Sequence, residues 1–218
     1  MIIKFIDVIN ILFPQICGIC GKINKDGLCN QCRIKLEGLA QYSIICEDFK
    51  NKYFNELIYI FKYEGLIRKL ILDYKFNEKS YMYVCFVKCI LENEKIYKKL
   101  KSYDVIIPVP ISNKRMKERG YNQSFLIAKE LSNRIKIDLQ TNCLWKTKHI
   151  IEQSKLNKEQ RKENIQNVYE LKNREILNNK HILLIDDIYT TGNTVNECAK
   201  ILQQGAPKKI DVLVLAKD

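Results

Sequence analysis

The spacing of apolar and polar residues changes near residue 105. Beyond this point, short apolar runs rich in β-branched residues occur at 105–109, 181–185 and 210–216 and alternate with stretches of helical periodicity. Such alternation is typical of βαβ units, in which crossover helices join parallel strands. We therefore expect an α/β fold, with a parallel sheet flanked by helices, in residues 101–218.

Residues 50–100, within the predicted segment 39–100, show apolar residues at helical spacing and no turn signals between them. The apolar positions fall into two groups: Leu57, Ile60, Phe61, Leu66, Leu70 and Ile71, followed by Val84, Val87, Cys89 and Leu91. This pattern predicts a helical segment that packs on the main domain.

The first 13 residues predict an amphipathic helix. One face would carry the apolar residues Phe5, Val8, Ile9 and Leu12. A signal peptide would need a basic start and a small-residue cleavage site, and neither is present. No apolar run approaches the roughly 18 to 20 residues of a membrane span. We expect this helix to pack against the rest of the protein, and the protein to be cytoplasmic.

Two Cys-x-x-Cys pairs lie close together near the start: Cys17 with Cys20, and Cys29 with Cys32. Each pair can form a tight turn that directs two thiolates to one point, and two such turns complete a tetrahedral zinc site. A redox site would need a single pair beside a thioredoxin-like strand, and neither condition is met. We therefore predict a small module, residues 1–38, organised by one structural zinc ion.

The remaining five cysteines lie outside such pairs: Cys46, Cys85, Cys89, Cys143 and Cys198. Cys85 and Cys89 are one helical turn apart, which suits a ligand pair, but core positions are the favoured interpretation. An odd total of nine cysteines without an export signal favours metal binding and free thiols over disulfides.

The formal net charge is +12, which favours a polyanionic partner. The excess is concentrated in residues 101–180, which hold 17 Lys and Arg against 9 Asp and Glu. Only seven basic residues are Arg, and the abundance of Lys, Ile and Asn is also what an AT-rich genome dictates. Charge alone therefore does not identify the partner.

The stretch ILLIDDIYTTGNT, residues 182–194, contains the strongest chemical signal. We expect a buried strand that ends at Ile185, so that Asp186 and Asp187 lie at its carboxyl end, where open α/β sheets bind ligands. A helix is expected from Thr194 to Gln203, and its N-terminus offers free backbone N–H groups. The residues before and at this terminus have the composition of a phosphate-binding loop: Thr190, Thr191, Gly192, Asn193 and Thr194.

A ribose 5-phosphate unit satisfies both halves of this motif, because carboxylates accept hydrogen bonds from sugar hydroxyls while the loop holds the phosphate. A magnesium-binding strand of a P-loop ATPase would need a GxxxxGK[ST] partner, and the chain has none. The dinucleotide fingerprint GxGxxG is also missing. A polar turn without a ligand would have to place two adjacent carboxylates without a compensating cation.

A second motif, DVIIPVPISNKRMKERGYNQS, covers residues 104–124. We expect a strand at 105–109 that is stopped by the prolines around it. A basic loop with Lys114, Arg115, Lys117 and Arg119 should follow, and then a helix from about Asn122. Arginine suits phosphate because its planar fork donates two hydrogen bonds at once. A solvated basic loop is the alternative interpretation.

The stretch at 182–194 resembles the motif with which type I phosphoribosyltransferases bind 5-phosphoribosyl 1-pyrophosphate (PRPP). The four-cysteine ribbon, FKYEGLIRKLILDYKF (61–76), RxxxRGYNQ (115–123) and this final motif, in that order, resemble the ComF family of competence-associated proteins. The resemblance implies a type I phosphoribosyltransferase-like fold that binds PRPP with Mg²⁺. It also implies that Asp186 and Asp187 hold the ribose, and that Arg115 and Arg119 contact pyrophosphate and act in catalysis.

The family also implies a mobile loop that closes over PRPP between these motifs. The residues that match it are Gln153, Ser154, Arg161 and Asn164. An ordinary exposed helix at 158–164 is an equally good interpretation. Displacement of pyrophosphate would depend mainly on positioning and electrostatics.

Two functions remain open at this point. The first is a PRPP-binding, phosphoribosyltransferase-like protein linked to DNA uptake or nucleotide metabolism, with an acceptor that the sequence does not reveal. The second is a single-stranded DNA-binding competence factor in which the domain is a non-catalytic ligand-binding module. Other competence or DNA-uptake proteins are expected partners in both cases.

Overall fold

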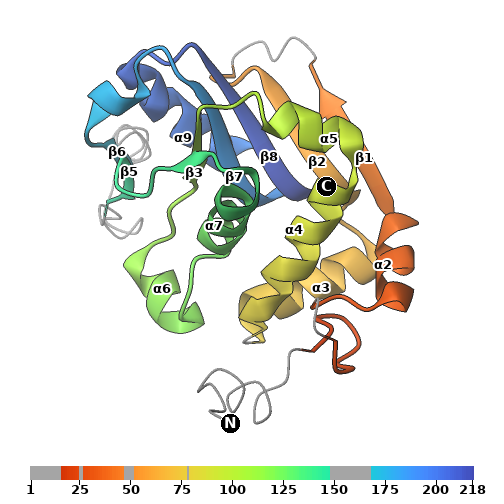
Figure 1. Cartoon of the computed structure of the whole chain (residues 1–218). Helices are drawn as coiled ribbons and strands as arrows, with labels where there is room; N and C mark the ends of the chain where they lie inside the picture. The colour runs from red at the N-terminus through yellow and green to blue at the C-terminus, as the bar shows by residue number, and fades with distance from the viewer. Residues whose placement is uncertain (1–15, 25–26, 47–51, 78, 148–167) are drawn as a thin grey trace, which may run out of the picture.

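The computed structural model describes residues 16–24, 27–46, 52–77, 79–147 and 168–218. A six-stranded sheet in the order β1-β2-β8-β7-β3-β4 forms its centre (Figure 1). The strands are β1 (Ala40–Ile45), β2 (Glu56–Lys62), β3 (Val105–Pro108), β4 (Asp138–Leu139), β7 (His181–Tyr189) and β8 (Lys209–Lys217). Only the β1–β2 pair is antiparallel within this sheet. The α/β fold with a mostly parallel sheet is therefore confirmed.

Helices cover both faces of the sheet. The helices are α2 (Asn30–Glu37), α3 (Gly65–Phe76), α4 (Tyr83–Glu92), α5 (Glu94–Leu100), α6 (Asn113–Arg119), α7 (Gln123–Ile135) and α9 (Asn193–Leu202). Helices α3, α4 and α7 lie in front of the sheet in Figure 1, and α9 lies behind it. Shorter elements complete the fold: 3-10 turns η1 (Ser80–Met82), η3 (Arg174–Leu177) and η4 (Gln203–Gly205), and a separate hairpin of β5 (Leu144–Lys146) and β6 (Tyr169–Leu171).

The central strands are apolar over most of their length because both of their faces are buried. Alternate residues of a strand point to opposite faces. Leu183 and Ile185 belong to the core under α3, α4 and α7, whereas Ile182 and Leu184 belong to the core under α9. The run 181–185 is thus read correctly from the sequence as a fully buried strand.

The expectation of helices throughout residues 39–100 is wrong for two segments. Residues 40–45 and 56–62 are strands β1 and β2, and β2 pairs in parallel with β8. The run Leu57, Ile60 and Phe61 fits helical spacing, but Leu57 and Ile58 are both fully buried because β2 has a core on each face. Helices do form at 65–76 and 83–92, as the pattern predicts.

The cysteine-rich segment packs on helix α4. A side chain at Gly18 would begin 2.7 Å from the Sγ atom of Cys85, so the close contact requires glycine there. The Cys85 thiol donates a hydrogen bond to the Gly27 carbonyl at 2.8 Å. Cys85 and Cys89 are both buried in the core, as expected. The predicted helix in the first 13 residues lies outside the described residues.

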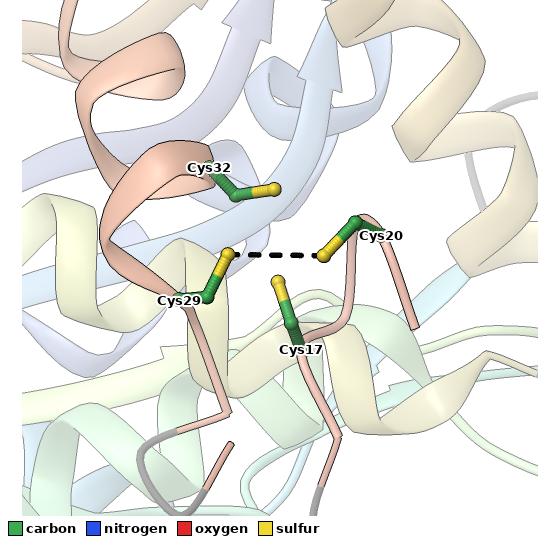
Figure 2. Close-up of side chains that lie close together, drawn as sticks. All are labelled: Cys17, Cys20, Cys29 and Cys32. Carbon is green, nitrogen blue, oxygen red and sulfur yellow. Dashed lines mark hydrogen bonds between the residues drawn. The ribbon is translucent and has the colours of Figure 1, made fainter. Parts of the chain in front are cut away.

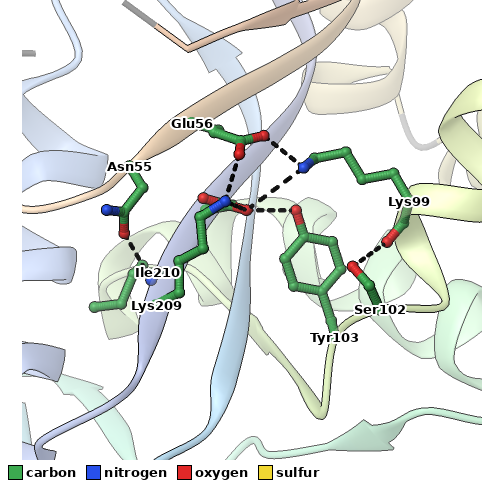
Figure 3. Close-up of polar contacts among 8 residues, drawn as sticks. Asn55, Glu56, Lys99, Ser102, Tyr103, Lys209 and Ile210 are labelled. Carbon is green, nitrogen blue, oxygen red and sulfur yellow. Dashed lines mark hydrogen bonds and ion pairs between the residues drawn. The ribbon is translucent and has the colours of Figure 1, made fainter. Parts of the chain in front are cut away.

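Charged residues are paired at the end of the sheet where β2 and β8 begin (Figure 3). Glu56 forms ion pairs with Lys99 of α5 and with Lys209. Burial raises the pKa of Glu56, but hydrogen bonds from Lys209 and Lys99 outweigh it and leave the pKa below its ordinary value. Tyr103 donates a 2.7 Å hydrogen bond to Asp211, which is 1% exposed. This network ties α5 to the strand ends opposite the site described below.

Within the described ranges, none of the helices combines the length and the apolar character that a bilayer crossing requires.

Candidate functional site

Strand β7 continues beyond Ile185, where the sequence pattern predicted its end. It remains paired with β8 up to Tyr189, which lies opposite Lys217. Asp186 and Asp187 are therefore the sixth and seventh residues of a nine-residue strand. They still lie toward its carboxyl end, but a regular backbone now fixes their directions. Because successive strand residues point to opposite faces, the two carboxylates meet different neighbours.

A small hollow that is open to solvent lies at this end of β7. It is lined by Asp186, Ile188, Thr190, Thr191, Gly192, Asn193, Thr194 and Val195. Helix α9 begins at Asn193, one residue before the position expected, so its free backbone N–H groups lie at the hollow. The structure thus brings one acid and the whole threonine loop together, while Asp187 is not part of this lining.

Asp186 is held by two donors. The Ser124 hydroxyl of α7 donates to its Oδ1 atom at 3.0 Å, and the backbone N–H of Asp187 donates to the same atom at 2.9 Å. Burial, followed by the charge of Asp187, raises the pKa of Asp186 to about 7. Its carboxylate therefore changes charge near neutral pH, which makes it sensitive to any nearby charge.

Asp187 is 9% exposed and is paired with a cation. The Nζ atom of Lys75, in the last turn of α3, lies 2.8 Å from its Oδ1 atom. The sequence reasoning missed this cation, although Lys75 lies inside the stretch at 61–76 that resembles the ComF family. The available signal was its position within this motif, which also carries Lys62, Arg68 and Lys69 and so does not single out Lys75.

The stretch RGYNQS, residues 119–124, links α6, α7 and the acids. Asn122 caps α7 through the Phe125 N–H, and its Nδ2 atom donates to the Val109 carbonyl at 3.0 Å. Tyr121 donates to the Tyr74 carbonyl, and Ser124 reaches Asp186. The helix expected from about Asn122 is confirmed as α7. The basic stretch before it is helix α6 rather than a loop, because Ser112 caps its first turn and Gly120 ends it.

The two candidate arginines lie in different surroundings. The Nη1 atom of Arg119 donates to the Gln123 Oε1 atom at 3.1 Å, and its guanidinium lies 4.7 Å from the centre of the Phe76 ring. The positive charge of Arg115 contributes to a lower pKa of Lys146 and opposes the rise in the pKa of Tyr169.

Lys146 is a second cation that the sequence reasoning missed. Its Nζ atom lies 3.3 Å from the Tyr169 hydroxyl in the β5–β6 hairpin. Burial and the charge of Arg115 lower the pKa of Lys146, whereas the charge of Asp186 opposes this shift. Lys146 is thus a cation of the hairpin whose charge interacts with Asp186. The predicted mobile-loop residues Gln153, Ser154, Arg161 and Asn164 lie outside the described residues.

Gly192 is required by both the conformation and the packing of the loop. Its φ of 74° lies in the left-handed region, and a Cβ atom there would overlap the ring of Tyr189. We expect Gly192→Ala to lower the free energy of unfolding by about 1–3 kcal/mol, measured by urea denaturation. Gly38→Ala is the control, because Gly38 has a φ of −65° and its nearest neighbour would lie 3.5 Å away. Equal stability of the two variants would contradict this account.

The four cysteines of the two Cys-x-x-Cys pairs converge, as Figure 2 shows. All four Sγ atoms lie within 4.8 Å of one another, and those of Cys20 and Cys29 are 3.7 Å apart. Sulfurs around a tetrahedral zinc ion, at about 2.3 Å from the metal, would be about 3.8 Å apart. The cluster can therefore hold a metal ion, and none of the nine cysteines forms a disulfide.

Comparison with known proteins agrees with this arrangement. Residues 122–218 match the phosphoribosyl transferase domain family. Competence protein F of Haemophilus influenzae is 28% identical, over 93% of this chain and 90% of its own length. DNA utilization protein YhgH of Escherichia coli K12 is 25% identical over the same shares, and competence protein ComFC of Bacillus subtilis is 22% identical over 93% of this chain and 78% of its own. These similarities support the resemblance of the chain to competence proteins of the ComF type, with a phosphoribosyltransferase-like fold.

Proposed function

We propose that the hollow at the end of β7 binds PRPP together with Mg²⁺. The observation that carries the proposal is the junction of Asp186 with the threonine loop at the N-terminus of α9. Backbone N–H groups at a helix N-terminus and exposed threonine hydroxyls suit a phosphate group. A carboxylate beside them suits the hydroxyls of the attached ribose. The ribose 5-phosphate unit is the part of such a ligand that needs a phosphate-binding loop and a carboxylate side by side.

Three further cations are candidates for the other end of this ligand. Arg115, Arg119 and Lys146 would add positive charge where pyrophosphate departs, because fixed charges stabilise charge that develops during a reaction. Mg²⁺ would be held mainly by phosphate oxygens and by few protein carboxylates, as is usual for this ion, and it would neutralise the leaving group. Asp186 and Asp187 would hold the ribose. The protein would act mainly by positioning.

The names of the relatives support a role in competence. Competence protein F, ComFC and the DNA utilization protein YhgH share nearly the whole length of this chain. We therefore propose that PRPP binding serves DNA uptake or the use of the nucleotides that uptake supplies, with other competence proteins as partners. The cysteine cluster would hold a structural Zn²⁺ ion, because four protein ligands leave no open coordination position.

Isothermal titration of the whole protein with Mg²⁺–PRPP tests this proposal. We expect a Kd between about 1 μM and 1 mM, the range usual for enzyme substrates. Thr191→Val should weaken binding by roughly tenfold, because it removes a hydroxyl from the hollow while its exposed position leaves the fold intact. Thr141→Val, also exposed but outside the hollow, is the control.

Absence of PRPP binding, or equal loss in both threonine variants, would contradict the proposed site. Titration with labelled single-stranded DNA is a parallel arm for the second candidate function. That function is favoured by exposed aromatic rings next to cations: Trp145 with Lys172 at 5.4 Å, and Phe76 with Arg119 at 4.7 Å. Such pairs can stack bases, and the affinity should then fall steeply with salt.

A further inference from the structure

The contact between Lys75 and Asp187 joins two parts of the chain that are far apart in sequence. The Nζ and Oδ1 atoms are 2.8 Å apart, and the two side chains are only 15% and 12% exposed. Helix α3 is fixed beside α7 because the Tyr74 hydroxyl donates to the Gln123 carbonyl at 2.9 Å. The ammonium group is therefore held against the acid by the fold, unlike a surface pair whose side chains move freely.

The positive charge of Lys75 also favours the ionised form of the neighbouring Asp186 carboxylate. The charged and titratable groups that act on Asp186 are Asp187 of β7, Lys75 of α3, Lys146 of β5, Tyr169 of β6 and Cys198 of α9. Of these, Lys75 is the cation that most favours the ionised form of Asp186. With Lys75 in place, the formal charge of the trio is −1 rather than −2, which reduces repulsion of an anionic ligand.

We propose that Lys75 is a positioning residue of the sugar site, whose ammonium holds Asp187 in place and favours the ionised form of the Asp186 carboxylate that faces the ribose. This inference rests on the proposed function of the same site. It gives α3 a role in ligand binding, although α3 contributes no residue to the lining of the hollow. It also answers the difficulty raised by the sequence, because the compensating cation comes from a distant helix.

A second ion pair nearby provides a matched control. Lys79 lies 2.8 Å from Asp73, the same separation as in the Lys75–Asp187 pair. Asp73 belongs to the same helix as Lys75, and neither member of this pair contacts Asp186 or Asp187 through any hydrogen bond or ion pair found in the described residues. Lys79→Met therefore removes one ion pair of the same kind without touching the acids.

The test compares Lys75→Met, Lys75→Arg and Lys79→Met in the whole protein. The first readout needs no ligand: carbon-13 NMR of the carboxyl group of Asp186 across pH. Lys75→Met should raise the pKa of Asp186 by about one unit, because it removes a neighbouring positive charge. Lys75→Arg, which keeps the charge, and Lys79→Met should leave it within about 0.3 units of the wild type.

The second readout is the affinity for Mg²⁺–PRPP as a function of pH. At pH 7 we expect Lys75→Met to weaken binding roughly five- to tenfold, and the loss should shrink above pH 8, where Asp186 is ionised again. Lys79→Met should bind as the wild type does. A purely structural role for Lys75 would lower stability without moving either pH profile.

The outcomes separate the two ideas. If wild-type protein does not bind PRPP, the proposed function fails whatever the NMR titration shows. If wild-type protein binds PRPP but Lys75→Met leaves the titration of Asp186 and the pH profile of binding unchanged, the role of Lys75 is refuted and the proposed function stands. A fold check by amide NMR accompanies each variant. If the methionine variant unfolds, Lys75→Gln, which removes the charge but keeps a polar side chain, replaces it, and an unchanged titration of Asp186 in that variant refutes the role of Lys75.

Discussion

Cys32→Ser is expected to release the metal and to lower the free energy of unfolding by about 3 kcal/mol or more, since metal binding contributes directly to folding in small metal modules. Cys32 is 8% exposed and belongs to the same core as Leu36 and the residues of α4. Loss of one thiolate would therefore disturb both the cluster and its packing. Denaturation followed by circular dichroism gives the stability, and elemental analysis of protein purified without chelator gives the zinc content.

Cys46→Ser is the control for this experiment. Cys46 is an exposed cysteine that does not belong to the cluster. Its replacement should change stability by less than about 0.5 kcal/mol and leave one zinc ion per chain. A Cys32→Ser protein with wild-type stability, or wild-type protein without zinc, would contradict the structural role of the metal.

Asp186→Asn is expected to have opposite effects on binding and on stability. PRPP affinity should fall by about 100-fold or more, because the acceptor for the ribose hydroxyls loses its charge. The rise in the pKa of Asp186 from 3.8 to about 7 corresponds to about 4 kcal/mol at 1.36 kcal/mol per pKa unit. Because the side chain is partly exposed, we expect stability at pH 8 to rise by roughly half of this, about 2 kcal/mol. The variant thus exchanges function for stability.

The sign follows from the titration of Asp186. Its pKa is raised from 3.8 to about 7 in the folded protein, so between pH 4 and pH 7 the folded state binds more protons than the unfolded state. Stability contributed by this group therefore falls as the pH rises through that window. Asn does not titrate, so the fall should be smaller in the variant, measured as urea denaturation at several pH values.

Asp73→Asn is the control with the opposite sign. Hydrogen bonds from Lys79 and Asn77 lower the pKa of Asp73, so its charged form stabilises the folded state and that contribution is lost as the pH falls. This variant should lose stability near neutral pH and bind PRPP as the wild type does. If Asp186→Asn instead lost stability at pH 8, the burial argument for Asp186 would be wrong.

Local patterns in the sequence were sufficient for several parts of the protein. The buried strand at 181–185, the helix after the threonine loop and the α7 helix from Asn122 depend on short-range spacing and capping. The four cysteines were found from their spacing alone, because ligand turns of this kind are local structures. The order of these motifs also indicated the resemblance to the ComF family, which the similar proteins support.

The tertiary structure decided the features that depend on contacts between distant residues. Strand β2 was misread because a short apolar run fits a helix and a doubly buried strand equally well, and only its pairing with β8 selects the strand. Lys75 could not be assigned to Asp187 from the sequence because tertiary packing brings α3 next to β7, with α3 also bonded to α7 through Tyr74. The sequence by itself determined which chemical groups the protein carries. The packing of α3, α7 and β7 decided which carboxylate faces the hollow and which one is paired with a cation, since charge pairing is set by distance in space rather than by distance along the chain.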